Sequence, residues 1–479
     1  MIDLIRNELK KITKKKVIYI MFLVTLSFMI LINIVGKKFQ STSYVIYDDE
    51  YMNYYKEQLT PELEASDPDY YADCKSMYDS YELAKKYDED SWQRQVISQR
   101  IQPTLKKIYL EKSGEDYEIA KAEYDKLIKA LENNDWRSFV QYDLDKTNLQ
   151  IELMSEEKNN NQLESLKDIK QTLEWRLEKN IPYDNSDLNT YLQCWLSARD
   201  SIRQYKDNKN PSQTEKVYHQ QDVATEAISR YAIENGIDET ISNQGNSNLK
   251  YGLANSAKSE LFNAFSGYSL FIIILIIIVA GTIVSEEFNK GTIKLLLVRP
   301  YSRVKILLSK YITCLIVLIC SIIFVALMQT VVGGIVYGFD SYKNPTVMYN
   351  YTTNSLNVVS MTGALATMVV AILPKLILLM TLAFTLSTVI TSSPVAMAIP
   401  LLGSMVESII NQLAIMYEKA NFLKYFVTPN WDFSQYLYGA LPQMKGITVG
   451  FSVCICLVYF IVMMALSIWN FKKKNIKNI

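Results

Sequence analysis

The feature that most constrains this chain is a set of long apolar runs, each long enough to cross a lipid bilayer. An α-helix needs about 20 apolar residues to cross a hydrocarbon core of about 30 Å. Because the bilayer interior offers no water to backbone N–H and C=O groups, these runs are expected to satisfy them as helices. The sequence therefore predicts an all-α membrane protein with six transmembrane helices.

The predicted spans are separated by one very long polar segment and by four short connections. In chain order the spans are Val17–Val35, Tyr268–Ser285, Lys310–Val336, Lys375–Ile390, Val395–Tyr417 and Thr448–Phe471. The first run is as long as a full span and no small-residue cleavage site follows it, which argues against a cleaved signal peptide.

The apolar stretch around the fourth span is too long for one perpendicular crossing. It extends from Leu356 to Thr391, and Pro374 divides it. Residues Val358–Leu373 are read either as an outer-leaflet segment or as the first half of a kinked helix. The body of the span is expected at Lys375–Ile390.

Charge is distributed unevenly and predicts the topology. Residues 37–260 hold 29 Lys+Arg and 42 Asp+Glu, whereas the rest of the chain holds 21 and 8. Most basic residues outside that segment flank the spans at the N-terminus, after the second span and at the C-terminus, which the positive-inside rule places in the cytoplasm. The chain is thus expected to be a multi-pass protein of the cell membrane with both termini cytoplasmic.

The long polar segment is predicted to be an extracytoplasmic helical domain. Apolar residues recur at i, i+3, i+4 and i+7 in several stretches: Tyr78–Tyr87, Val96–Leu110, Tyr117–Leu131, Leu163–Leu177, Leu188–Tyr205 and Val223–Asn235. The domain contains Cys74 and Cys194, which would be able to pair in an oxidising compartment; the sequence leaves this open.

Residues able to carry out catalysis are scarce. His219 is the single histidine and lies in a polar stretch, where a solvated side chain is expected. Gly252–Ser259 approaches a phosphate-binding loop, but Ala257 replaces its second glycine and no strand precedes it. The chain is therefore expected not to be an enzyme, to need no cofactor or metal, and to bind no nucleic acid.

Two ionisable residues lie inside apolar runs, where charge is costly and usually faces a cavity or a partner. Glu407 lies midway along the fifth span and Asn411 one turn later. They are candidates for a translocation path, or alternatively for a polar contact between helices. Lys375 is expected to extend outward toward the membrane surface.

The connection between the second and third spans is not composed like a simple loop. It reads SEEFNKGTIKLLLVRPYSRVKILLSK from Ser285 to Lys310, with two acids, a Gly-Thr pair, an apolar stretch and six basic residues. This pattern predicts a short helix at the membrane surface that contacts another element. The N-terminal residues 1–16 form a second basic amphipathic segment, typical of an interfacial helix.

The connection resembles the coupling region of ABC-2-type transporter permeases. That family carries Glu-Glu-x-x-x-Gly-Thr after the second span, then Pro-x-Ser-Arg, then Lys at the third span. The matching residues here are Glu286, Glu287, Gly291, Thr292, Pro300, Ser302, Arg303 and Lys310. The resemblance covers residues 1–36 and 259–479. The long outer domain is similar to insertions in permeases of Gram-positive bacteria.

The resemblance implies an ABC-2 exporter-like permease that forms a homodimer or pairs with a sister permease in the lipid bilayer. Two cytoplasmic ABC ATPase subunits would hydrolyse ATP. The helix from Glu286 to Val298 would dock in the ATPase, with Glu286 and Glu287 pairing with its basic residues. Gly291 would permit a close backbone approach or a sharp bend. The cargo would be an amphipathic antimicrobial peptide, lipid-like or drug-like compound.

An alternative function is a membrane-anchored surface scaffold or receptor whose outer domain binds a partner. In either case the predicted division is an interfacial helix at 1–16, a first span at 17–36, an extracytoplasmic domain at 37–262, a second span at 263–285, a cytoplasmic coupling region at 286–303, spans three to six within 304–471, and a basic cytoplasmic tail at 472–479.

Overall fold

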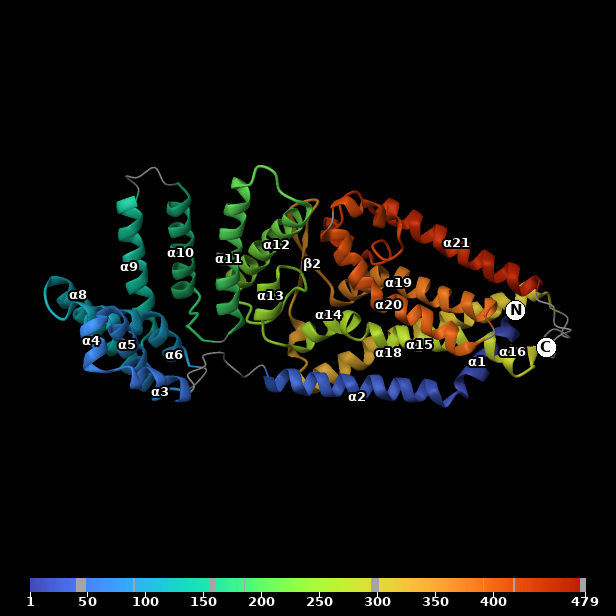
Figure 1. Cartoon of the computed structure of the whole chain (residues 1–479), viewed down its shortest axis with the longest axis horizontal. Coiled ribbons are helices and arrows are strands. Elements are labelled where there is room, and N and C mark those ends of the chain that lie inside the picture. The colour runs from blue at the N-terminus through green and yellow to red at the C-terminus, as the bar shows by residue number, and fades with distance from the viewer. Residues whose placement is uncertain are drawn as a thin grey trace.

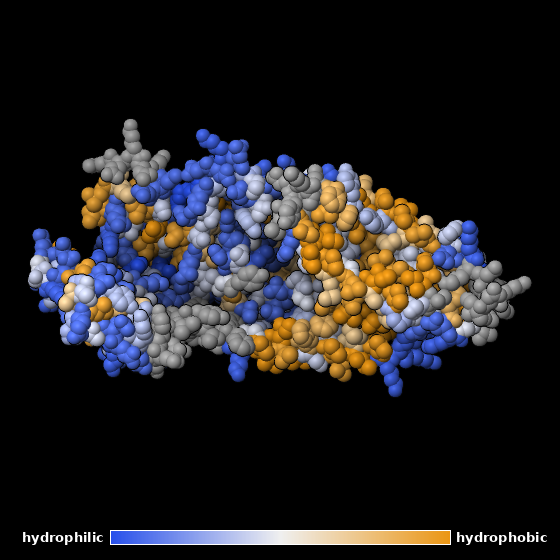
Figure 2. Space-filling model, in the orientation of Figure 1, coloured by the Kyte–Doolittle hydropathy of each residue, from blue (hydrophilic) through white to orange (hydrophobic). Residues whose placement is uncertain are grey.

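The computed structural model is elongated, with two distinct ends (Figure 1). It describes residues 1–39, 49–88, 91–154, 160–184, 186–293, 301–390, 392–416 and 418–473. The helices of residues 49–252, which we call the outer domain, lie toward one end, and the long apolar helices extend to the other, where the N-terminus lies. Hydrophobic residues gather on the surface of the long helices and hydrophilic residues on the outer domain (Figure 2).

The prediction of an all-α membrane protein with six spans is confirmed: among the described residues, six helical segments are long and apolar enough to cross a membrane. They are α2 (Lys16–Phe39), the run of α14 (Ala257–Gly267), α15 (Ser269–Thr282) and α16 (Ser285–Asn289), then α18 (Arg303–Tyr337), α19 (Met361–Val389), α20 (Ser393–Met416) and α21 (Val449–Lys473). The amphipathic helix α1 (Ile2–Thr13) precedes them.

The stretch around the fourth span differs from the prediction at its start. Helix α19 is continuous through Pro374, which favours one long helix over a separate outer-leaflet segment. Val358 and Val359 belong instead to strand β2 (Ser355–Val359), which pairs antiparallel with β1 (Thr346–Asn350). This hairpin was not predicted from the sequence. Strand β1 is buried, and Val347 N–H donates to the Ile241 carbonyl of the outer domain at 2.9 Å.

Helix α15 lies at the centre of the membrane-spanning half, and most of its side chains are buried among α18, α19 and α20. Polar side chains reinforce the packing of α2 against α18. The amides of Asn33 and Gln329, both fully buried, donate to each other at 3.3 and 3.0 Å. Because lipid is as apolar as leucine, such polar contacts contribute to the association of spans.

The outer domain is helical, as predicted. Its helices are α3 (Asp49–Glu57), α4 (Pro61–Ser66), α5 (Pro68–Ala84), α6 (Trp92–Val96), a π-helical turn (Ile97–Ile101), α7 (Gln102–Glu111), α8 (Glu115–Glu132), α9 (Trp136–Met154), α10 (Asn160–Glu178), α11 (Asp187–Asp207), α12 (Gln213–Asn235) and α13 (Ser247–Gly252). Helix α9 was not predicted, because it buries only a narrow stripe that includes Phe139 and Val140.

The two cysteines of the outer domain do not form a disulfide. Cys74 on α5 and Cys194 on α11 are both free and buried. Burial raises the pKa of the Cys194 thiol to about 11, which keeps it protonated and unreactive. His219 is not simply solvated as expected: its ring stacks on Tyr205, with centroids 3.8 Å apart.

The carboxyl group of Asp187 joins the outer domain to the segment that leads into α14. It accepts a hydrogen bond from Ala254 N–H at 2.6 Å. Burial, followed by the charges of Asp238 and Glu239, raises its pKa to about 7 despite that bond. The carboxyl group of Asp187 therefore holds its proton more tightly in the folded state than in the unfolded chain. Protonated Asp187 contributes fully to the free energy of unfolding below about pH 4, and this contribution is lost as pH rises through about 7.

We therefore expect Asp187→Asn to flatten the pH dependence of stability between about pH 4 and 7, where one such group contributes a slope of up to about 1.4 kcal/mol per pH unit. The measurement is the thermal unfolding midpoint of the purified full chain across this range. Asp116→Asn, at an exposed position in the first turn of α8, is the control and should leave the slope unchanged. An unaltered slope in Asp187→Asn would contradict the assignment.

Candidate functional site

The predicted coupling region begins with the short helix α16. Glu286 and Glu287 occupy its first turn, where carboxylates interact favourably with the helix dipole. The helix ends before Gly291, which has φ +68°, a left-handed conformation that favours glycine. No described atom lies within 4 Å of a Cβ placed there. Of the two roles considered for this glycine, the geometry therefore supports the sharp bend.

Glu287 points inward and joins a cluster of four charges, which we call the ion quartet: the buried Glu8, Glu287 and Lys310, and the exposed Lys11. Lys310 Nζ lies 2.9 Å from Glu8 Oε2 and 2.8 Å from Glu287 Oε1, and its side chain is 0% exposed. Lys11 Nζ contacts the same two acids at 2.9 and 2.8 Å. Two carboxylates and two ammonium groups thus neutralise one another and link α1, α16 and α18.

The groups of α1 in this cluster remain charged. Burial alone would raise the pKa of Glu8, but Lys310 and Lys11 together bring it below its ordinary value. Burial likewise opposes the charged form of Lys11, yet its hydrogen bonds to Glu287 and Glu8 raise its pKa. Pairing therefore outweighs desolvation for both members of the quartet that α1 carries.

Glu286 has a different environment. Its side chain is 33% exposed and contacts Lys15 at 3.0 Å and Lys290 at 3.6 Å. Lys15 also donates to Thr282 Oγ1 at 3.0 Å. The resemblance implied that both acids face a partner protein, whereas Glu287 is already committed within the chain. Glu286 is the acid of this pair that remains accessible at the surface.

Hydroxyl groups connect the start of α16 to the turn between α19 and α20. Ser387 Oγ accepts from the backbone N–H groups of Val284 and Ser285 at 3.3 and 3.0 Å. Ser285 Oγ lies 2.7 Å from Ser393 Oγ. These bonds satisfy N–H groups at the beginning of a helix, which otherwise have no partner within it.

The last span also reaches this region. Phe288 of α16 packs edge-to-face on Phe471 of α21, with ring centroids 6.4 Å apart. Arg303, at the start of α18, donates from Nη1 to the Lys472 carbonyl at 2.9 Å. Helix α16 therefore meets elements from α1, α18, the α19–α20 turn and α21 at one place.

The remaining predicted coupling residues take peripheral positions. Thr292 Oγ1 donates to the Glu287 carbonyl at 3.5 Å, which closes the bend after α16. Ser302 caps α18, since its Oγ accepts from Lys305 N–H at 3.4 Å. Pro300 and the apolar stretch before it, residues 294–299, lie outside the described residues.

The two candidates for a translocation path lie one turn apart on α20 but differ in their hydrogen-bond partners. Glu407 Oε2 pairs with Lys375 Nζ at 2.6 Å, and Glu407 Oε1 accepts from Trp431 Nε1 at 2.6 Å. The expectation that Lys375 extends outward is therefore wrong, because a buried carboxylate on the neighbouring helix offers it a partner. No hydrogen bond joins Asn411 to Glu407, and the buried Oδ1 of Asn411 has no hydrogen-bond partner among the described residues.

The contribution of α1 to the site was not predicted from the sequence. Glu8 follows Leu4 and precedes Ile12 at helical spacing, and these are the three buried residues of that helix. An acid on the apolar face of a basic amphipathic helix is a detectable signal for a buried ion pair. Its partners Lys310 and Glu287 are far away in the sequence and cannot be identified from this pattern.

Comparison with known proteins places the chain in a family. Residues 237–477, which include β1, β2 and five of the six spans, match the model described as "Protein of unknown function (DUF2705)". The chain belongs to this family. It is 33% identical over 202 residues to the "Uncharacterized protein YhcI" of Bacillus subtilis, a match that covers 42% of this chain and 64% of the relative.

A second relative in the same organism is the "Uncharacterized membrane protein YdbK". It is 28% identical over 203 residues, which cover 42% of this chain and 77% of the relative. The chain thus spans about two thirds of the first relative and three quarters of the second. No solved structure matches. Together with the six apolar helices, these matches identify a multi-pass membrane protein.

Proposed function

We propose that this chain is the permease subunit of an ATP-binding-cassette exporter, and that α16 receives movement from a separate ATPase. The observation that supports this most directly is the convergence on α16 of contacts from α1, α18, the α19–α20 turn and α21. A helix bound to so many spans at one end would transmit a displacement to all of them.

The two acids of α16 would divide the work of coupling. Glu287, held in the ion quartet, would make α16 move with α1 and α18 as one body. Glu286, which is partly exposed beside Lys15 and Lys290, would face the ATPase. The bend at Gly291 would direct the following residues away from the helix bundle.

The complete transporter would contain two such permeases, or one with a sister permease, and two cytoplasmic ATPase subunits. Its cargo would be an amphipathic compound, such as an antimicrobial peptide or a lipid-like molecule, moved out of the cell. The outer domain would lie on the side where cargo is released.

The test is co-purification of the chain with ABC ATPases of the same genome, followed by measurement of ATP hydrolysis in lipid nanodiscs. We expect Glu286→Arg to reduce permease-stimulated hydrolysis at least tenfold while membrane insertion stays normal. Asp340→Arg, which reverses an exposed acid outside the site, should have no effect. Failure of the wild-type chain to bind any such ATPase would refute the proposal and favour a surface scaffold or receptor.

A further inference from the structure

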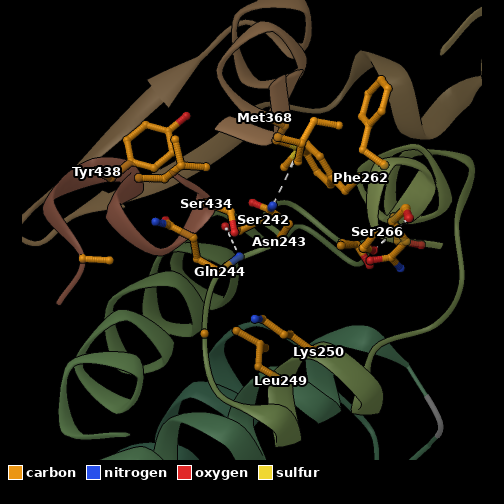
Figure 3. Close-up of a pocket in the computed structure, with 18 of the residues that line it drawn as sticks. Ser242, Asn243, Gln244, Leu249, Lys250, Phe262, Ser266, Met368, Ser434 and Tyr438 are labelled. Carbon is orange, nitrogen blue, oxygen red and sulfur yellow. Dashed lines mark hydrogen bonds between the residues drawn. The ribbon is translucent and has the colours of Figure 1, made fainter. Parts of the chain in front are cut away.

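A cavity of about 810 Å³ lies between the outer domain and the membrane-spanning helices. On the side of the outer domain it is lined by Ser242–Gly245 and by α13. On the side of the spans it is lined by α14, α15 and α19, and part of the segment before α21 completes the wall. Figure 3 shows Lys250 and Leu249 across the open space from Phe262 and Met368. Its volume falls in the range of about 300–1,000 Å³ that is usual for sites binding small organic molecules.

The part of the cavity wall formed by α19 is largely apolar. Met368, Ile372 and Leu376 are four residues apart on α19 and so lie on one face of that helix. At 1.5 Å per residue they extend over about 12 Å, enough for a substantial part of an acyl chain. Phe262 of α14 adds an aromatic ring next to Met368.

Three charged side chains line the cavity, and among the described residues only the charged group of Lys250 has neither a hydrogen bond nor an ion pair. Lys375 is paired with Glu407, and Asp432 accepts from Ser434 N–H at 2.9 Å as the cap of a 3-10 helix. The ammonium group of Lys250 makes no hydrogen bond or ion pair with the described residues, and it extends into the open space. Lys250 is an exposed residue, but surrounding protein still lowers its pKa, and an anion beside it would favour its charged form. Neutral polar groups, including Asn263 and Ser266, lie near the apolar wall.

We propose that this cavity binds one amphipathic molecule with an anionic headgroup, its headgroup on Lys250 and its chain along Met368, Ile372 and Leu376. An ammonium group facing an apolar surface matches an alkyl phosphate or a phospholipid, and a purely polar anion would leave the α19 wall uncovered. This binding does not rest on the proposed exporter function, because it needs neither an ATPase nor transport.

The experiment titrates the purified full chain, in a neutral detergent, with four probes followed by native mass spectrometry. The probes are phosphatidylglycerol, phosphatidylcholine, dodecyl phosphate and inorganic phosphate. We expect phosphatidylglycerol or dodecyl phosphate to bind with one-to-one stoichiometry, at least tenfold more tightly than phosphatidylcholine, and inorganic phosphate not to bind. Tighter binding of phosphatidylglycerol than of dodecyl phosphate would identify a bilayer lipid as the ligand. Tighter binding of dodecyl phosphate would identify a free amphiphile.

Two variants locate the site. Lys250→Glu should weaken binding of the anionic probe at least tenfold, and Ser266→Trp, which fills an exposed position of the cavity without removing a packed side chain, should do the same. Lys216→Glu makes the same charge change on the exposed surface of α12 and should bind like the wild type. The proposal would be overturned if all three variants bound the anionic probe as tightly as the wild type, or if Lys216→Glu weakened binding as much as Lys250→Glu.

Discussion

Lys310→Met is expected to lower the free energy of unfolding by about 3–5 kcal/mol, the usual cost of removing one member of a buried ion pair. Without Lys310, Glu8 and Glu287 would face each other with only Lys11 to neutralise them, and Lys11 is 53% exposed. The remaining like charges would repel each other in a poorly solvated space. We expect α1 to detach from α16 and α18 before the spans themselves separate.

The measurement combines the thermal unfolding midpoint of the full chain with the protease susceptibility of α1. Lys305→Met is a matched control, because Lys305 is exposed on the same helix and should change the midpoint little. In the triple variant Glu8→Gln, Glu287→Gln, Lys310→Met the three buried charges are absent, and most of the stability should return. A Lys310→Met chain that unfolds like Lys305→Met would show that the quartet does not hold this end together.

The number of spans could be predicted because apolar length is a local property of the sequence. The bilayer requires about 20 apolar residues for each crossing, and no distant residue changes that requirement. The hairpin was missed for the opposite reason. Strand β1 is held by Ile241 of the outer domain, a contact that separates residues by more than a hundred positions.

The candidate site likewise combines features that the local sequence predicts with features that depend on distant residues. The Glu-Glu and Gly-Thr pairs were detected as a motif, and the left-handed conformation of Gly291 agrees with the bend considered for it. Which acid is buried depends on where Lys310 and Glu8 lie after folding, which no spacing within residues 286–303 reveals. Lys375 was misread because its partner Glu407 lies on the next helix.

Lys375→Met is expected to lower the free energy of unfolding by about 3 kcal/mol, since it leaves the Glu407 carboxylate inside the membrane-spanning region without its cation. The side chains of Lys375 and Glu407 are only 20% and 12% exposed, so water replaces the lost partner poorly. The Trp431 indole would still donate to Glu407, but one neutral hydrogen bond does not offset the charge. Loosening of α20 and of the segment that carries Trp431 should follow.

Glu407→Gln should be milder, because the freed Lys375 ammonium lines the water-accessible cavity beneath the outer domain and can be solvated there. The double variant Lys375→Met, Glu407→Gln should recover most of the loss, so that the coupling energy from the mutant cycle is about 2 kcal/mol or more. Lys343→Met provides the control, as its pair with Asp340 is 77% and 84% exposed and contributes under about 1 kcal/mol. Thermal unfolding in one detergent supplies all four values. If the effects of the two single substitutions on the free energy of unfolding simply add, the ion pair between α19 and α20 contributes no coupling energy.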